Sequence, residues 1–192
     1  MVRERADIEA FKAYTRSFSL ADLERLEAEI YGSSDRATAV LLGSMVDSAL
    51  EFFIGGQLRP TLNSNDRGNL FGERGPFGTF SAKILTAYAF NLFGPETRSD
   101  LDLIRTIRNA FAHSRRPFGF DAATDLCRRL QSPEWQTGPL PAQFTTKIPG
   151  LGPADPNNTR TRYMTACHVL TYGLVIGGNS GVRSRGASFD LR

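Results

Sequence analysis

The sequence predicts an all-α fold: a compact helical bundle with a long proline-rich loop region and a flexible C-terminal tail. Three observations support this prediction. Five long segments repeat apolar residues at helical spacing, no segment shows the alternation of a strand, and glycine, proline, serine or threonine stands at most segment ends. With 192 residues, of which 41% are hydrophobic, the chain can bury one substantial core.

The first two predicted helices, residues 20–30 and 35–54, are separated by a break at Gly32. Either serine that follows this glycine can cap the second helix. That helix is apolar almost all the way round, so we expect it to lie at the centre of the bundle and to end at Gly55. Four of its apolar residues line up at helical spacing: Leu41, Met45, Ala49 and Phe52. Five more widen this stripe until it almost surrounds the helix: Val40, Val46, Leu50, Phe53 and Ile54.

Residues 57–78 predict an irregular surface segment, because glycine, asparagine and proline are frequent among them. Near its end, Gly75, Pro76 and Gly78 predict a tight turn directly before the next helix. This stretch lacks the spacing of a nucleotide-binding phosphate loop. We therefore interpret the three residues as structural.

The third and fourth helices are predicted at residues 79–93 and 99–114. Thr79 and Ser99 are the expected caps, and the Gly94–Pro95 pair is expected to stop the third helix. The fourth helix carries acidic residues in its first turn and basic residues at its end. That order suits the helix dipole.

Residues 116–157 are predicted to be loop-rich, because seven of the ten prolines lie there; only residues 121–130 look helical. A fifth long helix is predicted at residues 158–178, closing a single domain, and residues 179–192 are expected to form the tail. The apolar stripe of the fifth helix is predicted to consist of Tyr163, Ala166, Leu170 and Leu174.

Composition argues against several classes of protein. The net charge of +3 permits an acidic partner without requiring one. Cys127 and Cys167 stand alone and His168 lies beside an apolar stripe, so all three are expected in the core, and no metal or cofactor site is predicted. The charged N-terminus and the absence of about 18 consecutive apolar residues predict a cytoplasmic protein without a membrane span.

One short segment, RNAFAH, combines three side chains that could carry chemistry. Asn109 and His113 share a face of the fourth helix, and Arg108 lies beside them. An imidazole can take the proton from a ribose 2′-hydroxyl, and a guanidinium can hold the phosphate, so the set could cleave RNA without a metal ion. Arg115 and Arg116 would add attraction for a phosphate backbone.

The same residues also fit a structural interpretation, which spacing alone favours because short motifs often match by chance. Arg108 could pair with Asp35 or Asp47 on a neighbouring helix. Asp35 suits the start of the second helix, whereas Arg36 is unfavourable there unless a carboxylate pairs with it. The expected candidates for that carboxylate are Glu51, Asp100 and Asp102. We interpret Asp35, Arg36 and Asp47 as structural residues.

Residues 33–115 resemble the mannitol operon repressor family, written MtlR or MltR. Three successive blocks carry the resemblance: SDRATAVLLGSMVDSALEFFI, LFGERGPFGTFSAKILTAYAFNLF and DLDLIRTIRNAFAH. The resemblance implies an all-helical domain in a bacterial transcriptional regulator. Such a regulator is expected to act as a homodimer through a protein partner, for example another regulator or a phosphocarrier protein, and not through specific DNA binding.

The RNAFAH segment alone also resembles the Arg-x4-6-His pattern of HEPN domains. This second resemblance implies a metal-independent ribonuclease, or an RNA-binding toxin or defence module, that builds one cleft from two copies of the motif. Arg108, Asn109 and His113 would then be the active residues. The sequence thus leaves three hypotheses. The MtlR-type regulator leads and the ribonuclease is the alternative; the third is binding or turnover of a small molecule in a pocket under the long loop.

Overall fold

The structure, a computed structural model, describes residues 29–131 and 158–179. All regular structure in these two ranges is helical, which confirms the all-α prediction. The predictions for residues 1–28, 132–157 and 180–192 lie outside the described residues; they concern most of the first helix, most of the proline-rich region and the tail.

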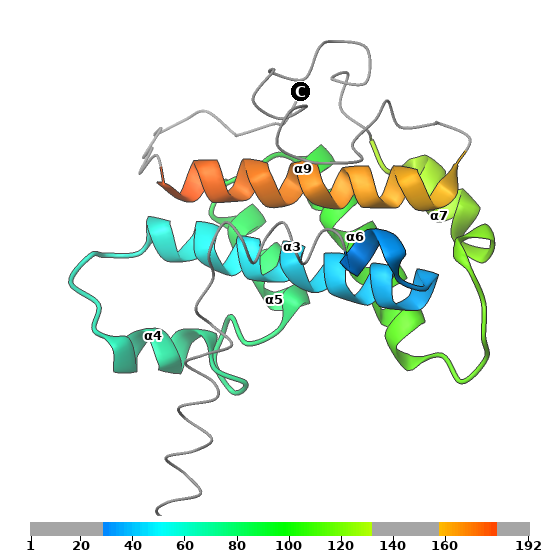
Figure 1. Ribbon diagram of the computed structural model, residues 1–192. Helices are drawn as coiled ribbons and strands as arrows, with labels where there is room; N and C mark the ends of the chain where they lie inside the picture. Colours follow the sequence, from blue (N-terminus) through cyan, green and yellow to red (C-terminus); the bar gives the residue numbers. More distant parts are fainter. Residues whose placement is uncertain (1–28, 132–157, 180–192) are drawn as a thin grey trace, which may run out of the picture.

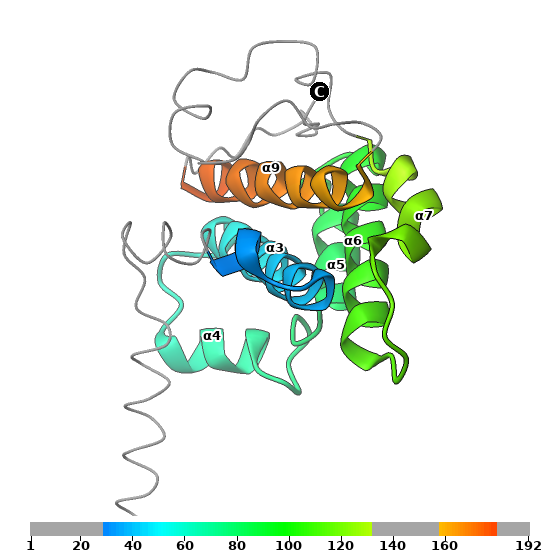
Figure 2. The same cartoon turned by 45° about the vertical axis from the view of Figure 1, so that its right-hand side comes forward.

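Two long helices form the centre of the fold: α3, Asp35–Gln57, and α9, Thr159–Asn179. They lie side by side and run in the same direction (Figure 1, Figure 2). The hydroxyl of Tyr163 in α9 donates to the carbonyl oxygen of Ala39 in α3 at 3.0 Å, which ties the first turns of the two helices together. The helices α5, α6 and α7 pack on this parallel pair.

The start of α3 agrees with the prediction, and its buried face agrees in part. Ser34 is the cap, and its hydroxyl accepts the N–H of Ala37; the helix then continues beyond the expected end to Gln57. Of the four residues that line up at helical spacing only Ala49 is buried, and Phe52 is 48% exposed. The residues that line the core most closely are Leu42, which was not predicted, and Val46, Leu50 and Phe53, which were predicted to widen the stripe. Helices α5, α6 and α9 pack against α3.

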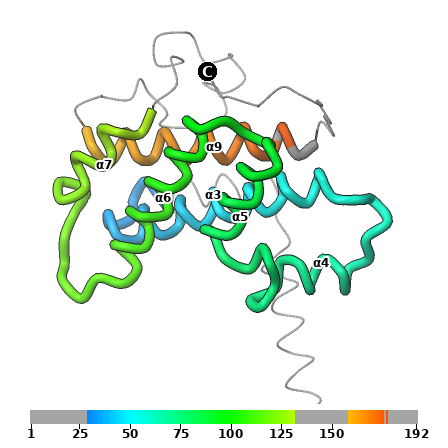
Figure 3. Tube along the Cα trace, turned by 180° about the vertical axis from the view of Figure 1, so that it is seen from behind, coloured from blue at the N-terminus to red at the C-terminus, as the bar shows by residue number. Residues whose placement is uncertain are grey.

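The helices α5, Phe80–Ala89, and α6, Pro95–His113, cross the α3–α9 pair from behind (Figure 3). Thr79 caps α5 as predicted, but α5 ends at Ala89, and Asn91 follows in a left-handed conformation with φ 53°. Helix α6 begins four residues earlier than predicted. Proline is well suited to the first turn of a helix, so Gly94–Pro95 starts α6 instead of only stopping α5.

The segment between α3 and α5 contains a short helix that the sequence analysis missed, α4, Ser64–Phe71. Asn63 and Asp66 cap it reciprocally, each side chain bonding to the backbone N–H of the other. The predicted tight turn follows it. A side chain at Gly75 or Gly78 would collide with backbone carbonyls, because the chain folds back on itself there.

Helical structure continues after α6 in two short pieces, η1, Phe120–Ala123, and α7, Thr124–Arg129, close to the predicted range. The guanidinium of Arg162 in α9 holds the end of α7. Its Nε donates to the carbonyl of Cys127 at 2.7 Å, and Nη2 donates to the carbonyl of Leu130 at 2.7 Å. An arginine from another helix thus satisfies carbonyls that the end of α7 leaves without helical partners.

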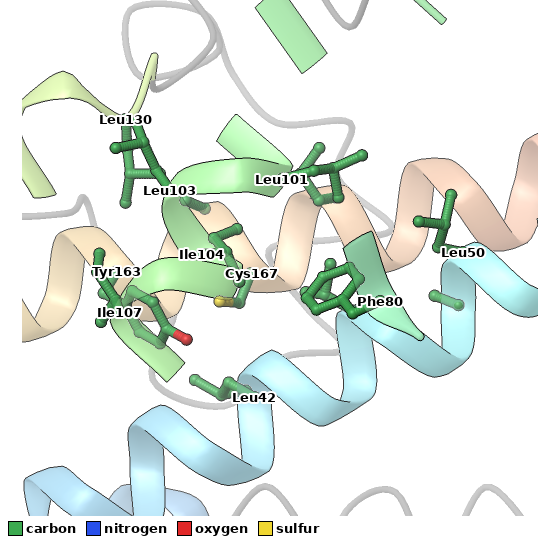
Figure 4. Close-up of a cluster of buried hydrophobic side chains, with 14 of the residues drawn as sticks. Leu42, Leu50, Phe80, Leu101, Leu103, Ile104, Ile107, Leu130, Tyr163 and Cys167 are labelled. Atoms are coloured by element: carbon green, nitrogen blue, oxygen red, sulfur yellow. The ribbon is translucent and has the colours of Figure 1, made fainter. Parts of the chain in front are cut away.

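One hydrophobic core joins these helices (Figure 4). Each fully buried Leu or Ile side chain in it contributes about 2 kcal/mol through removal from water. The predicted core cysteines, Cys127 and Cys167, are buried and unbonded to each other. The side chains labelled in Figure 4 come from α3, α5, α6 and α9 and from the end of α7: Leu42, Leu50, Phe80, Leu101, Leu103, Ile104, Ile107, Leu130, Tyr163 and Cys167.

Within the described ranges, α3 alone has the length and apolar composition to cross a bilayer. Half of its most apolar stretch is buried inside the fold, against α5, α6 and α9. This packing accounts for its apolar surface.

A single arginine at the start of α9 joins three parts of the chain. Arg160 Nη1 pairs with Asp35 Oδ1 at 3.0 Å, and the other oxygen of this carboxylate accepts the N–H of Phe120 at 2.9 Å. Arg160 Nη2 has four oxygen acceptors between 2.8 and 3.3 Å away: the carbonyls of Ile30, Tyr31 and Ser33 and the hydroxyl of Thr38. Asp35 therefore has the contacts of a structural residue, and its partner is Arg160.

We expect Arg160→Ala to lower the free energy of unfolding by about 3 kcal/mol, because hydrogen bonds to a charged group are lost and Asp35 keeps an unpaired charge. Urea denaturation followed by circular dichroism measures this loss. Arg128→Ala is the matched control: the Arg128–Asp125 ion pair is exposed, so its removal should change stability by less than about 0.5 kcal/mol. Equal stability of Arg160→Ala and wild type would contradict the role of Arg160.

Candidate functional site

The RNAFAH segment forms the last turns of α6 and ends the helix at His113. Ile107 and Phe111 anchor this end in the core, being 1% and 0% exposed. Phe111 also stacks on Phe118, with ring centroids 4.4 Å apart, which fixes the chain directly after the helix. A rigid helix end therefore carries Arg108, Asn109 and His113.

The stem of Arg108 lies against α3 at Gly43. A Cβ atom at position 43 would stand only 2.6 Å from Arg108 Cγ and 2.7 Å from Arg108 Cβ. The same position is 3.1 Å from the hydroxyl oxygen of Tyr163 in α9. The absence of a side chain at Gly43 therefore leaves the space in which the arginine stem fits.

Among the described residues, the guanidinium of Arg108 has one hydrogen-bond partner: Nη1 donates to Asn109 Oδ1 at 2.9 Å. Its Nε is buried and has no hydrogen-bond partner among the described residues. No carboxylate in the described ranges pairs with Arg108, so the expected pairing with Asp35 or Asp47 is wrong. Both carboxylates have other partners: Asp35 pairs with Arg160, and Asp47 pairs with a lysine.

The cation beside Asp47 is Lys83, a side chain that the sequence analysis did not single out. Lys83 is 5% exposed, and its Nζ lies 2.7 Å from Asp47 Oδ1 and 2.9 Å from Glu51 Oε2. The contact with Asp47 is an ion pair without the alignment of a hydrogen bond. The signal in the sequence was a single lysine in the otherwise uncharged α5.

His113 is exposed at the end of α6, and no described residue forms a hydrogen bond or ion pair with it. Asn109 and His113 are four residues apart and share one face of α6. The bond to Asn109 therefore bends the guanidinium of Arg108 toward the face that carries His113. The structure brings Arg108 and Asn109 into contact, and it leaves the imidazole open to solvent one turn away.

Three further arginines surround this helix end. Arg36 Nη2 donates to the carbonyl of Arg116 at 3.1 Å, and the side chains of Arg115 and Arg116 are exposed. The expected carboxylate partner of Arg36 is therefore wrong, because the start of α3 faces the turn after α6 and not an acidic helix. We name Arg36, Arg108, His113, Arg115 and Arg116 the basic end of α6.

Among the described residues, no carboxylate forms an ion pair with an arginine of the basic end. Asp35 and Asp121 both lie beside Gly119 in the turn that follows α6, and Arg160 matches the charge of Asp35. The carboxylates that the sequence suggested as partners for Arg36 have other contacts. Glu51 contacts Lys83, Asp102 contacts Arg105, and Asp100 accepts the N–H of Gln131. An anion that approached the basic end would therefore meet uncompensated guanidinium groups.

Two buried groups away from this end have displaced pKa values. Burial raises the pKa of Asp100 to about 6, against the opposing effects of the Gln131 N–H and the charge of Arg162. Burial lowers the pKa of His168 to about 4, so this histidine is a neutral core residue, and its Nε2 has no hydrogen-bond partner among the described residues. Neither group faces the basic end.

The cysteines and metal-ligand types offer no second reactive centre. Burial raises the pKa of the Cys127 thiol to about 12 and that of Cys167 further still, so neither thiol is a nucleophile at neutral pH. Across residues 29–131 and 158–179, no three His, Cys, Asp or Glu side chains gather as a metal would require. Among the described residues, the basic end of α6 remains the candidate site.

Comparison of the chain with protein-family models, with curated proteins and with solved structures found no match.

We expect Asp100 and His168 to act on stability in opposite directions between pH 4 and 6.5. The pKa of Asp100 is raised in the folded state, so its contribution is full below about pH 4 and is lost as pH rises through about 6. The pKa of His168 is depressed, so its contribution is full above pH 6.5 and is lost as pH falls toward 4. Each effect amounts to at most about 3 kcal/mol.

The measurement is urea denaturation of wild type, Asp100→Asn and His168→Gln at several pH values. Relative to wild type, Asp100→Asn should lose stability more steeply on acidification, because only the histidine effect remains. His168→Gln should show the reverse. Identical pH profiles for the three proteins would contradict both assignments.

Proposed function

We propose that the chain binds the phosphate backbone of RNA at the basic end of α6 and cleaves it without a metal ion, in the manner of HEPN-type ribonucleases. The observation that supports this most is the state of Arg108. Its guanidinium is partly buried, has no carboxylate partner among the described residues and is held beside the face of an exposed histidine. An arginine whose role was only structural would be expected to have oxygen acceptors for its buried N–H groups, as Arg160 and Arg162 have.

In the proposed reaction each side chain has a separate task. Arg108 donates to the non-bridging phosphate oxygens and stabilises the charge that builds on them. Asn109 holds the guanidinium through the 2.9 Å bond to its Oδ1. The neutral imidazole of His113 takes the proton from the ribose 2′-hydroxyl.

The 2′-oxygen then forms a bond to phosphorus, and the bond between phosphorus and the 5′-oxygen breaks, leaving a 2′,3′-cyclic phosphate. The departing 5′-oxygen needs a proton. One copy of the chain provides a single imidazole at the basic end, so we propose a homodimer in which the protonated imidazole of the second copy supplies it. Arg36, Arg115 and Arg116 would hold the flanking phosphates.

The ribonuclease proposal predicts that purified protein cuts single-stranded RNA in EDTA and leaves 2′,3′-cyclic phosphate ends. Arg108→Ala and His113→Ala should each reduce the rate by about 100-fold or more, because phosphate binding or proton transfer is lost. Arg128→Ala, which removes an exposed arginine on α7, should keep the wild-type rate.

The reaction also predicts a difference between binding and cleavage. RNA with 2′-O-methyl groups should bind, with an affinity that falls as salt is added, but should not be cut. Circular dichroism of every variant shows whether the fold is kept. Absence of cleavage by the wild type, or full activity of a folded His113→Ala, would contradict the proposal.

We propose as the second candidate a transcriptional regulator of the MtlR type, which acts through a protein partner in the cytoplasm. Its support is the resemblance of residues 33–115 together with apolar surface on α5. Leu85 is 58% exposed and Phe90 71% exposed, and large apolar side chains at such exposure are frequent where a protein partner binds.

The regulator proposal predicts that the immobilised chain retains a transcription regulator or a phosphocarrier protein from a native lysate, identified by mass spectrometry. Leu85→Asp and Phe90→Asp should lose this protein, because a charge would be buried in the interface. His113→Ala is the control and should retain it. Retention of no such protein, or equal retention by all variants, would contradict this function.

A further inference from the structure

The side chain of Arg108 lies in the seam where α6 meets α3 and α9, and its direction depends on residues outside α6. Its Cβ and Cγ occupy the space that a side chain at Gly43 would need. Two atoms so close to the α6 backbone cannot swing aside as the end of a flexible side chain can. A methyl group at position 43 would therefore move either α6 or the whole arginine side chain.

Tyr163 closes the same space from α9. Its hydroxyl donates to the Ala39 carbonyl and would lie 3.1 Å from a Cβ at Gly43, beside the arginine stem. The side chain is 0% exposed, and Figure 4 shows its hydroxyl pointing from α9 toward α3. Burial raises the pKa of Tyr163 well above its usual range, so the hydroxyl remains protonated and keeps this bond at all working pH values.

We propose that Gly43 and Tyr163 are positioning residues that direct the guanidinium of Arg108 toward Asn109 and the face of His113. Gly43 provides the space for the stem, and Tyr163 prevents the stem from sinking between α3 and α9. With Nε enclosed and Nη1 on Asn109, the remaining edge of the guanidinium, Nη2, is the part presented to a single phosphate group. Gly43, Arg108 and Tyr163, which are far apart in the sequence, thus form one anion-binding position.

Gly43→Ala tests the proposal, with Gly68→Ala as the matched control, because a Cβ at Gly68 in α4 meets nothing within 4 Å. The activity readout rests on the proposed RNA-binding function. Gly43→Ala should weaken RNA binding and cleavage between ~10-fold and ~100-fold, since a displacement of about 1 Å at a binding group has effects of that size. Gly68→Ala should leave both unchanged.

A double-variant cycle separates positioning from general damage to the fold. If Gly43 acts through Arg108, then adding Gly43→Ala to Arg108→Gly, which removes both atoms that a Cβ at position 43 would meet, should cause no further loss of RNA affinity. Tyr163→Phe in the same cycle should behave likewise. A loss that is equally large with and without Arg108 would overturn the proposal.

A second readout does not depend on RNA. The Nε–H of Arg108 is buried, so its NMR signal should exchange slowly with water in the wild type and in Gly68→Ala. In Gly43→Ala and Tyr163→Phe this signal should shift and exchange faster. An unchanged signal in both would overturn the positioning role. A changed signal in a protein that binds no RNA would retain the positioning role and refute the proposed function.

Discussion

The guanidinium of Arg160 is the contact on which the arrangement of the helices depends most. This guanidinium lies at the start of α9. Its hydrogen-bond acceptors come from the end of one helix, from the start of the next helix and from the carboxylate that also holds η1. Backbone carbonyls at a helix end have no partners within the helix, so an arginine that reaches several of them fixes two helices at once. This contact sets the parallel register of α3 and α9.

That register determines what α6 meets. With the first turns of α3 and α9 tied together, Gly43 and Tyr163 face the same point in the seam, where the stem of Arg108 lies. The turn after α6 then meets the beginning of α3, where Arg36 bonds to the carbonyl of Arg116. The basic end of α6 is thus a consequence of helix packing, although its residues come from separate parts of the chain.

The sequence was sufficient for the helices with clear periodicity and caps, and for cysteines and a histidine in the core. It failed where packing decides between equivalent local choices. The apolar surface predicted for α3 includes most of its buried residues, but it does not show which of its apolar side chains stay exposed, because an almost wholly apolar helix carries no information about its rotation. The predicted partners of Arg108 and Arg36 were wrong for a related reason. The sequence offers several carboxylates for each arginine, and only the folded structure shows which carboxylate pairs with which cation.

The contrast between Arg160 and Arg108 follows from that assignment. Both side chains are partly buried between helices, but Arg160 has a carboxylate and four oxygen acceptors on Nη2, whereas Arg108 has one amide oxygen. Removal of a guanidinium from water costs several kcal/mol unless partners replace the water. In Arg160 the protein supplies those partners, and the side chain serves the fold. In Arg108 the described residues leave the cost uncompensated, and an anion from outside would compensate it. A partly buried charge without a partner is typical of binding sites, where the folded protein is less stable than it would be with that charge paired.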